Sequence, residues 1–260
     1  MRAASLLPKF HLGNLKKGII MKGSYKKGLL HGMPIGLGYL SVSFAFGIQA
    51  VASGLYPWQA LMISLTNVTS AGQLAGISLM AGGAGLLEMA LTQFTINLRY
   101  ALMSLSLSQK LDGSMTLFHR MTIAACNTDE VFVVASGQPG KIGRAYLYGL
   151  TITPYIGWAL GTMLGAIAGG FLPQQVTAAL GIAIYGMFIA IVLPPFQRQR
   201  EVRMVVLVAV GMSCLFAWFP LFSFLTGGFR IIICAITASA LGAWLVPRPS
   251  ESSPMPEGDA

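Results

Sequence analysis

The sequence predicts an all-α, polytopic integral membrane protein with six to eight membrane segments, some of them broken or re-entrant. Three observations lead to this fold class. The mean hydropathy is +0.69 and only 10 % of the residues are charged, whereas a soluble domain carries about 25 % charge. The apolar residues form runs of about 20, the length that crosses the hydrocarbon core as a helix. Gly and Pro mark the connections, as in SGLYPW at 53–58 and AGGAG at 81–85.

Eight apolar runs are candidate membrane segments. They cover residues 29–53, 58–80, 86–107, 121–136, 145–169, 176–196, 205–225 and 229–246. Two of these runs are doubtful as complete crossings. The run 58–80 contains SLTNVTSAGQ at its centre, and the run 121–136 is short and contains Asn127, Thr128, Asp129 and Glu130. We therefore expect both to be broken or re-entrant, and the alternative with eight full crossings stays open.

Basic residues are distributed as a topology signal. Of the 17 Lys and Arg, seven precede residue 28 and three lie between 198 and 203. Eight crossings would place 13 inside and 3 outside, whereas two re-entrant segments would place 15 inside and only Arg230 outside. The second arrangement fits the positive-inside rule slightly better and has the N-terminus in the cytoplasm. The same distribution argues against nucleic-acid binding, which needs a basic face interleaved with aromatic residues.

The chain is expected to have three parts. Residues 1–27 form a basic cytoplasmic leader, residues 28–246 form the transmembrane domain, and residues 247–260 form a disordered, acidic, Pro/Ser-rich tail. The leader lacks the continuous apolar core of a signal peptide. Met21 is an alternative start, and a chain that begins there is expected to insert and function normally because three lysines remain before residue 28.

No metal or cofactor is expected. The three cysteines fall in apolar stretches without a C-x-x-C spacing, so they are interpreted as small buried hydrophobic residues. The three histidines are scattered and form no metal-binding spacing.

Polar side chains inside the apolar runs are the candidate functional residues, because charge at membrane depth is costly and usually faces a protein-lined or watery cavity. One stripe with the spacing i, i+4, i+7, i+11 is formed by Glu88, Thr92, Thr95 and Arg99. Glu88 lies near the end of its run and is expected to be solvated. Arg99 lies deeper, so it either reaches the loop at 108–120 or requires an anionic partner.

Asp129 and Glu130 are the obvious anions for Arg99. One interpretation is a static salt bridge that joins two segments. The other is a charge cluster that binds substrate or changes protonation during transport. Two adjacent carboxylates repel each other and burial disfavours their charge, so one of them is expected to hold a proton readily. The second interpretation therefore predicts a site that can carry a proton.

The stretch TNVTSAGQLAG at 66–76 is a second polar cluster, in which Gly72 and Gly76 loosen the helix. Irregular backbone at membrane depth survives only where it lines a cavity or is covered by protein. Transporters use such broken helices because the freed N–H groups attract a substrate carboxylate. The alternative is close helix packing through small residues.

These stretches together resemble the AzlC/YgaZ family of branched-chain amino acid permeases, also called LIV-E exporters. The resemblance covers about residues 28–200 and is specific only in combination. It rests on GYLSVSFAFGIQAVASGLYPWQALMIS (38–64), SAGQL (70–74), LTQFTINLRYALMSLSL (91–107) and NTDEVF (127–132). It implies a multi-pass exporter of Val, Leu, Ile or related residues in the cytoplasmic (inner) membrane. It also implies a small AzlD-type membrane subunit as partner and no cofactor.

The resemblance also implies functional residues. Gln73 matches the polar residue of the family's G-A-x-Q, Asn97 and Arg99 match its [DN]-x-R-H, and Thr128, Asp129, Glu130 and Phe132 match T-D-E-x-F. The chain departs from the family at three positions: Ser70 replaces the usual Gly, Gly72 the usual Ser or Ala, and Tyr100 the usual His. Because Tyr100 removes a group that titrates near neutral pH, Asp129 and Glu130 become the better proton carriers.

The resulting hypothesis is a proton-coupled exporter of hydrophobic amino acids, not an enzyme. Substrate binding is assigned to Gln73, Asn97, Arg99, Asp129 and Gly72, and proton coupling to Glu130 and Asp129. The apolar side chain of the substrate is expected against aromatic residues such as Phe44 and Phe46. Two alternatives stay open: a non-transporting membrane subunit of a transport complex, and an intramembrane enzyme with Asp129 and Glu130 as acid and base.

Overall fold

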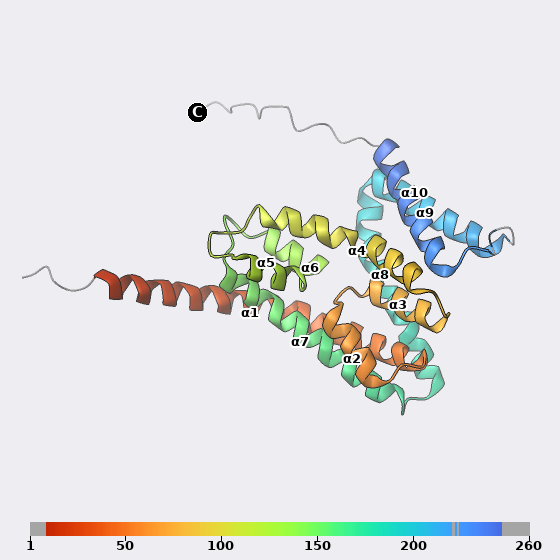
Figure 1. The fold of residues 1–260 in the computed structure, drawn as a ribbon, viewed down its shortest axis with the longest axis horizontal. Helices are drawn as coiled ribbons and strands as arrows, with labels where there is room; N and C mark the ends of the chain where they lie inside the picture. Colours follow the sequence, from red (N-terminus) through yellow and green to blue (C-terminus); the bar gives the residue numbers. More distant parts are fainter. Residues whose placement is uncertain (1–8, 220–221, 223, 246–260) are drawn as a thin grey trace, which may run out of the picture. The chain divides into compact units, whose positions relative to one another are not determined.

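The computed structural model describes residues 9–219, 222 and 224–245, and these residues form an all-helical chain (Figure 1). The predicted tail at 247–260 lies outside the described residues. The chain divides into two compact units, residues 1–187 and 188–260. The helices are α1 (Lys9–Ala52), α2 (Pro57–Thr66), α3 (Ala71–Ala81), α4 (Leu86–Ser108), α5 (Leu117–Ala124), α6 (Asp129–Ser136), α7 (Arg144–Gly169), α8 (Gln174–Arg198), α9 (Arg200–Trp218) and α10 (Gly227–Leu245).

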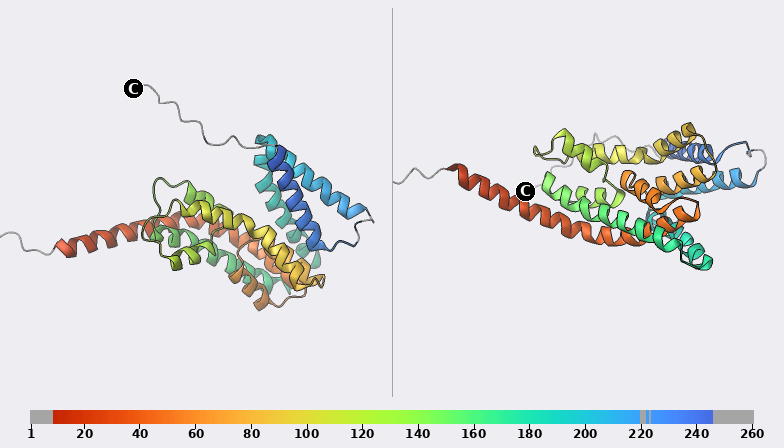
Figure 2. Two further views of the ribbon diagram at one scale, coloured as in Figure 1. Left: turned by 45° about the horizontal axis from the view of Figure 1, so that its top comes forward. Right: turned by 60° about the horizontal axis from the view of Figure 1, so that its bottom comes forward.

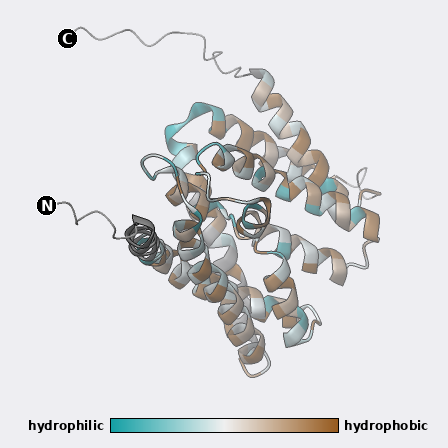
Figure 3. Cartoon of the chain, turned by 60° about the vertical axis from the view of Figure 1, so that its left-hand side comes forward, coloured by the Kyte–Doolittle hydropathy of each residue, from teal (hydrophilic) through white to brown (hydrophobic). Residues whose placement is uncertain are grey.

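Four helical stretches in the described part of the chain are long and apolar enough to cross a membrane. They are Ser24–Ala52, Arg144–Gly169, Arg200–Trp218 and Gly227–Trp244. Hydrophobic residues dominate the helices, and hydrophilic residues gather in the loops (Figure 3). The predicted count of six to eight membrane segments stays a prediction. Helix α1 also extends back to Lys9, into the stretch expected to be a leader.

The long helices α1 and α7 lie side by side and run in the same direction (Figures 1 and 2). Gly149 packs against the backbone of Tyr25, Gly157 against Gly36, and Gly165 against Phe44, so the contacts advance together along both helices. A Cβ atom at any of these three glycines would collide with the facing backbone. Small residues that let backbones approach closely are the usual basis of helix packing in membranes.

The segment 121–136 is interrupted and returns to the side from which it starts. Helices α5 and α6 have eight residues each, about 12 Å, which is far short of the hydrocarbon core. The loop before α5 and the loop after α6 are hydrogen-bonded to each other, with Asp112 N donating to Ile142 O at 2.9 Å and Ile142 N to Lys110 O at 2.8 Å. Because the two loops touch, α5 and α6 form a re-entrant pair.

The segment 58–80 is interrupted in the same way, between α2 and α3. Ala60 near the start of α2 and Ile77 near the end of α3 belong to one buried cluster with Ala50 and Ala166, which lie near the C-terminal ends of α1 and α7. Both ends of the α2–α3 pair therefore lie at the same level of the bundle, and this pair is also re-entrant.

Within residues 1–187, one pattern thus occurs twice: a long helix followed by a broken, re-entrant pair, as α1–α3 and as α4–α6. Helix α4 follows the end of α3, which packs at the level of the C-terminal ends of α1 and α7. It leads to the loop that contacts the start of α7, where Arg144 N donates to Ser114 Oγ at 3.2 Å. The two copies of the pattern therefore run in opposite directions. Such inverted repeats are typical of secondary transporters. Both doubtful segments are broken in the structure, which favours the re-entrant arrangement over eight full crossings.

In the second unit, α9 and α10 pack against each other. Ser213 and Cys234 lie 3.6 Å apart, oxygen to sulfur, and Cys234 is buried. The interpretation of this cysteine as a buried small residue is confirmed.

The re-entrant pairs predict a specific pattern of cysteine labelling. In a cysteine-free background, Ser114→Cys and Lys141→Cys should react from one side of the membrane, because both exposed residues lie in the touching loops. Ser53→Cys and Gly85→Cys should react from the other side. A membrane-impermeant maleimide applied to oriented vesicles measures this accessibility. Opposite accessibility of positions 114 and 141 would restore the eight-crossing arrangement.

Candidate functional site

The break between α5 and α6 places Asp129 and Glu130 in the first turn of a helix. Thr128 caps this helix, its hydroxyl accepting a hydrogen bond from Val131 N at 3.4 Å. Thr followed by acidic residues is a typical helix start, because the cap satisfies a free N–H and the carboxylates face the positive end of the helix dipole. The adjacent carboxylates therefore mark a helix start inside an interrupted membrane segment.

Arg99 and Asp129 form the ion pair expected from the sequence. Arg99 Nη1 lies 3.1 Å from Asp129 Oδ2, and the two side chains are 45 % and 41 % exposed. Arg99 Nη2 also donates to Tyr100 Oη at 2.8 Å, and the guanidinium carbon lies 4.8 Å from the centre of the Tyr100 ring. Arg99 is about 20 Å along α4 from Leu86 and about 14 Å from Ser108, which places the pair near mid-helix.

Glu130 has a different partner. Its Oε2 is hydrogen-bonded to the Tyr39 hydroxyl of α1, which also lies 2.6 Å from Thr128 Oγ1. The Tyr39 ring packs edge-on against Trp158 of α7, with 5.2 Å between the ring centres. The two adjacent carboxylates thus face different helices, as the 100° rotation per helical residue predicts.

The Tyr39 hydroxyl has one proton and two oxygen neighbours, so it can donate to only one of them. When Glu130 is charged, Tyr39 donates to the carboxylate and Thr128 donates to Tyr39. When Glu130 is protonated, it can donate to Tyr39, which then donates to Thr128. The hydroxyl groups of Tyr39 and Thr128 can therefore satisfy the side chain of Glu130 with or without a proton.

The break between α2 and α3 lies at 67–70. Tyr155 of α7 donates to the Leu65 carbonyl at 2.9 Å, which satisfies an acceptor left free where α2 ends. Thr69 Oγ1 donates to Asn67 Oδ1 at 2.7 Å within the break. Ser70 has a φ of +28°, the only non-Gly residue with positive φ in the described part of the chain. The sharp turn explains why glycine would suit this position.

One polar face of α4 covers both breaks. Its residues Gln93, Asn97 and Ser104 have the spacing i, i+4, i+11 and so share one side of the helix. Gln93 Nε2 donates to the Gly72 carbonyl at 2.7 Å, and Asn97 Nδ2 donates to Gln93 Oε1 at 3.1 Å. At the other break, Asn127 Nδ2 donates to Ser104 Oγ at 3.0 Å. The two interruptions therefore lie beside the middle of one helix.

The structure brings most, but not all, of the predicted site residues to these clusters. Arg99 contacts Asp129, Glu130 lies beside them in the sequence, and Asn97 lies near Gly72. Gln73 points elsewhere: it is 1 % exposed and donates to Ser64 Oγ at 2.9 Å, and Ser64 lies 2.7 Å from Thr162 Oγ1. Gln73 thus joins α3 to α2 and α7. Roles in binding and proton transfer remain predictions for all of these residues.

Two smaller expectations are wrong. Glu88 is only 7 % exposed, so it is not solvated in the manner expected from its place near a segment end. Phe46 is 2 % exposed and packs in the cluster with Ala50 and Ala60, so it is not available to a substrate side chain.

Sequence reasoning missed Tyr39, Gln93 and Trp158. Each is a polar or amphipathic residue inside an apolar run, which is the general signal for a functional or bridging position in a membrane protein. Tyr39 stands in the quoted stretch GYLSVSFAFG, and Gln93 stands in LTQFTINLR. Their partners are distant in sequence, so the signal identifies the residues but not the contacts.

Relieving the positive φ of Ser70 should stabilise the protein. Backbone held in a sparsely populated region costs a non-Gly residue about 1–3 kcal/mol, and glycine removes that cost at a smaller entropic penalty. Ser70→Gly should therefore raise the Tm by about 2–4 °C, measured by thermal unfolding in detergent. The matched control is Ser78→Gly, in the regular part of α3, which should lower the Tm. A lower Tm in both variants would contradict the strain argument.

A family model described as "AzlC protein" matches residues 34–172, which include both re-entrant pairs and all of the polar clusters. The chain belongs to the AzlC family. It is 27 % identical over 235 residues to "Inner membrane protein YgaZ" of Escherichia coli (strain K12). The aligned region covers 88 % of this chain and 94 % of that protein. It is 31 % identical over 222 residues to an "Uncharacterized membrane protein" of Archaeoglobus fulgidus, covering 85 % and 94 %. No solved structure matches.

The descriptions of both relatives name membrane proteins, and membership of the AzlC family indicates a role related to membrane transport. Two of the positions at which the chain departs from the family pattern have structural consequences. Ser70 carries the positive φ. Tyr100, at the position of the usual His, packs against Arg99 and so helps to orient the guanidinium toward Asp129.

Proposed function

We propose that the protein is a secondary transporter that exports branched-chain or similar hydrophobic amino acids across the cytoplasmic membrane in exchange for protons. The observation that carries the proposal is the placement of two helix breaks beside the middle of α4, with the Arg99–Asp129 pair at one of them. Broken helices at mid-membrane, contributed by inverted repeats, are the usual setting of substrate sites in secondary transporters.

The Arg99–Asp129 pair is chemically suited to a zwitterion. An amino acid carries a carboxylate and an ammonium group close together. Its carboxylate can replace Asp129 beside the guanidinium, and its ammonium can replace Arg99 beside Asp129, so neither charge is left without a partner. The carbonyl of Gly72 and the amide of Asn97 are both hydrogen-bonded to Gln93 at the other break, about 200° around α4 from Arg99, so they form a separate polar cluster.

Glu130 is proposed as the proton carrier. It lies next to Asp129 in the sequence and is half-buried, and its hydrogen-bond chain with Tyr39 and Thr128 is satisfied in both protonation states. Protonation of Glu130 would change the charge beside the substrate site by one unit, which is how substrate release could be coupled to proton entry.

The orientation follows from charge. With α1 and α7 parallel and both pairs re-entrant, the positive-inside rule favours the N-terminal end of α1 and the loops around 110 and 141 in the cytoplasm. Lys110 and Lys141 are held in these loops by backbone carbonyls, Lys110 Nζ donating to Gln138 O and Lys141 Nζ to Gln109 O, both at 2.7 Å.

A small AzlD-type membrane subunit is proposed as partner. The Arg99–Asp129 pair is nearly half exposed at mid-length of α4, where hydrocarbon cannot solvate charges. Such a pair needs water in a protein-lined path or a covering protein, and a second membrane protein would supply that cover. Exposed apolar residues on the same helix, such as Leu98 and Leu102, suit contact with another membrane helix.

Leucine efflux from proteoliposomes tests the proposal. Vesicles loaded with radiolabelled leucine are prepared with the chain alone, with the small subunit alone, and with both. Efflux well above that of empty vesicles is expected from the vesicles that contain both proteins. Arg203→Gln, which removes an exposed charge in α9, should leave this efflux unchanged. Equal efflux from all preparations would refute transport, and efflux from the small subunit alone would make this chain the non-transporting component.

A further inference from the structure

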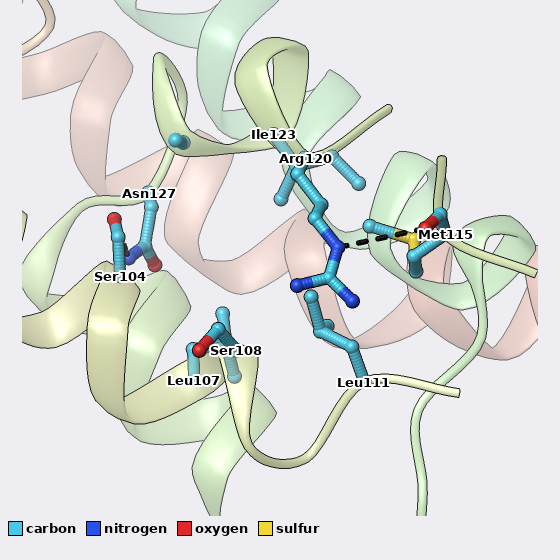
Figure 4. A pocket seen from close by; sticks show the side chains of 9 residues that line it. Ser104, Leu107, Ser108, Leu111, Met115, Arg120, Ile123 and Asn127 are labelled. Atoms are coloured by element: carbon cyan, nitrogen blue, oxygen red, sulfur yellow. Dashed lines mark hydrogen bonds between the residues drawn. The ribbon is translucent and has the colours of Figure 1, made fainter. Parts of the chain in front are cut away.

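A cavity lies at the cytoplasmic end proposed for α4, on the loop side of the α5–α6 break (Figure 4). Its volume is about 120 Å³. The walls are largely apolar and come from the end of α4, the loop that follows, and α5. Leu107, Leu111, Met115 and Ile123 form these walls.

Two polar groups border this cavity without being fully used by the protein. Arg120 extends from α5 across the cavity, and its Nε is 3.5 Å from the Met115 carbonyl (Figure 4). Asn127 is 3 % exposed; its Nδ2 donates to Ser104, and its buried Oδ1 has no hydrogen-bond partner. Because the Ser104 hydroxyl can donate or accept, either orientation of the Asn127 amide leaves one polar atom unpaired.

A buried polar atom without a partner is costly, and in native proteins it calls for an explanation such as a ligand. The unpaired oxygen of Asn127 is a hydrogen-bond acceptor, the guanidinium of Arg120 is a donor, and apolar side chains line the same cavity. An α-amino acid with an aliphatic side chain has the matching groups: an ammonium donor, a carboxylate acceptor and a branched apolar chain.

We propose that this cavity is a second amino-acid site, distinct from the Arg99–Asp129 pair, which takes up the substrate on the cytoplasmic side before it reaches the break. Arg120 binds the carboxylate, Asn127 Oδ1 accepts from the ammonium, and the side chain packs against Leu107, Leu111 and Ile123. The inference rests on the proposed function, which supplies the class of ligand. Asn127 lies two residues before Asp129, so the two sites adjoin each other.

The size of the cavity sets its specificity. An engineered apolar cavity of about 150 Å³ accepts benzene, so a volume of about 120 Å³ holds only an aliphatic side chain of three or four carbons, and the charged groups of the ligand extend toward Arg120, which is exposed. Valine, leucine and isoleucine fit, whereas the indole of tryptophan does not. Lysine would bring a second ammonium beside Arg120 and is also excluded.

Protection of a cysteine in the cavity wall tests the site. Cys126, Cys214 and Cys234 are replaced by Ala, and Ser108→Cys is introduced as the reporter. A membrane-impermeant thiol reagent is applied from the loop side, with and without amino acids. Saturating leucine or isoleucine should slow labelling several-fold, and tryptophan or lysine should leave the rate unchanged.

Two further variants identify the site responsible. Arg120→Gln should raise the leucine concentration needed for half-protection by about tenfold or more, because a charge-assisted hydrogen bond is lost, and Arg120→Lys should raise it less. The double variant Arg99→Gln/Asp129→Asn should leave the leucine concentration needed for half-protection unchanged.

The outcomes separate this inference from the proposed function. Leucine efflux without protection of Ser108→Cys, or protection that the Arg99/Asp129 double change abolishes and Arg120→Gln leaves intact, would overturn the second site. Protection at an unchanged concentration in the double variant, combined with a shift in Arg120→Gln, supports it. Protection without any leucine efflux would leave the cavity as a binding site and refute transport.

Discussion

Replacing Arg99 by Gln, or Asp129 by Asn, should each reduce the amount of folded protein, and the double replacement should recover much of it. Each single change leaves one charge without its partner at mid-length of α4, 3.1 Å from where the partner stood. The cost should be smaller than the roughly 3–5 kcal/mol of breaking a fully buried pair, because nearly half of each side chain is exposed and water can screen it.

The coupling between the two positions is measured as a double-mutant cycle. Monodisperse yield from size-exclusion chromatography and the Tm in detergent are the two readouts. Arg203→Gln, an exposed arginine outside this cluster, is the matched control and should change neither. Additive losses in the double variant would mean that Arg99 and Asp129 do not pair in the membrane.

Replacing Glu130 by Gln should abolish leucine flux driven by a pH gradient while leaving folding, substrate binding and equilibrium exchange intact. Gln has the shape of Glu and can still accept a hydrogen bond from Tyr39, but it cannot take up a proton. The contact with Tyr39 and the cap by Thr128 are therefore retained, and only the titrating group is removed.

Tyr39→Phe is the companion variant. It removes the hydroxyl that links Glu130 to Thr128 and keeps the ring that packs against Trp158. Gradient-driven flux should fall in Tyr39→Phe but less than in Glu130→Gln, because Glu130 itself can still titrate. Full gradient-driven flux in Glu130→Gln would show that another group carries the proton.

The sequence predicted the interrupted segments well, because the cause is local. Polar runs such as TNVTS cannot continue through a membrane as apolar helix, and Thr128 followed by two acidic residues is a helix cap. The pairing of Arg99 with one of two adjacent carboxylates was also predictable, since a charge at that depth needs a partner. Which of the two carboxylates pairs with Arg99 depends on the residue at which α6 begins, and therefore on the position of the break.

The remaining features depend on contacts between distant residues. Tyr39 reaches Glu130 across 91 positions and Ser64 reaches Thr162 across 98, and no local pattern encodes such separations. Gln73 is a polar residue in an apolar run, as Asn97 is, and yet its side chain contacts Ser64. The backbone turn at Ser70, just before α3 begins, sets this direction. Likewise, the spacing of Gly149, Gly157 and Gly165 indicates close packing, but not that the partner is α1 or that it runs parallel.

The exchange of leucine for protons is tested most directly by the pH inside vesicles during leucine efflux. Proteoliposomes with the chain and its small subunit are loaded with leucine and an entrapped pH-sensitive dye, and then diluted into leucine-free buffer of the same pH. The lumen should acidify as leucine leaves, because protons enter in exchange. Glu130→Gln vesicles should show no acidification. Leucine efflux from wild-type vesicles with no change of internal pH would contradict the proposed coupling.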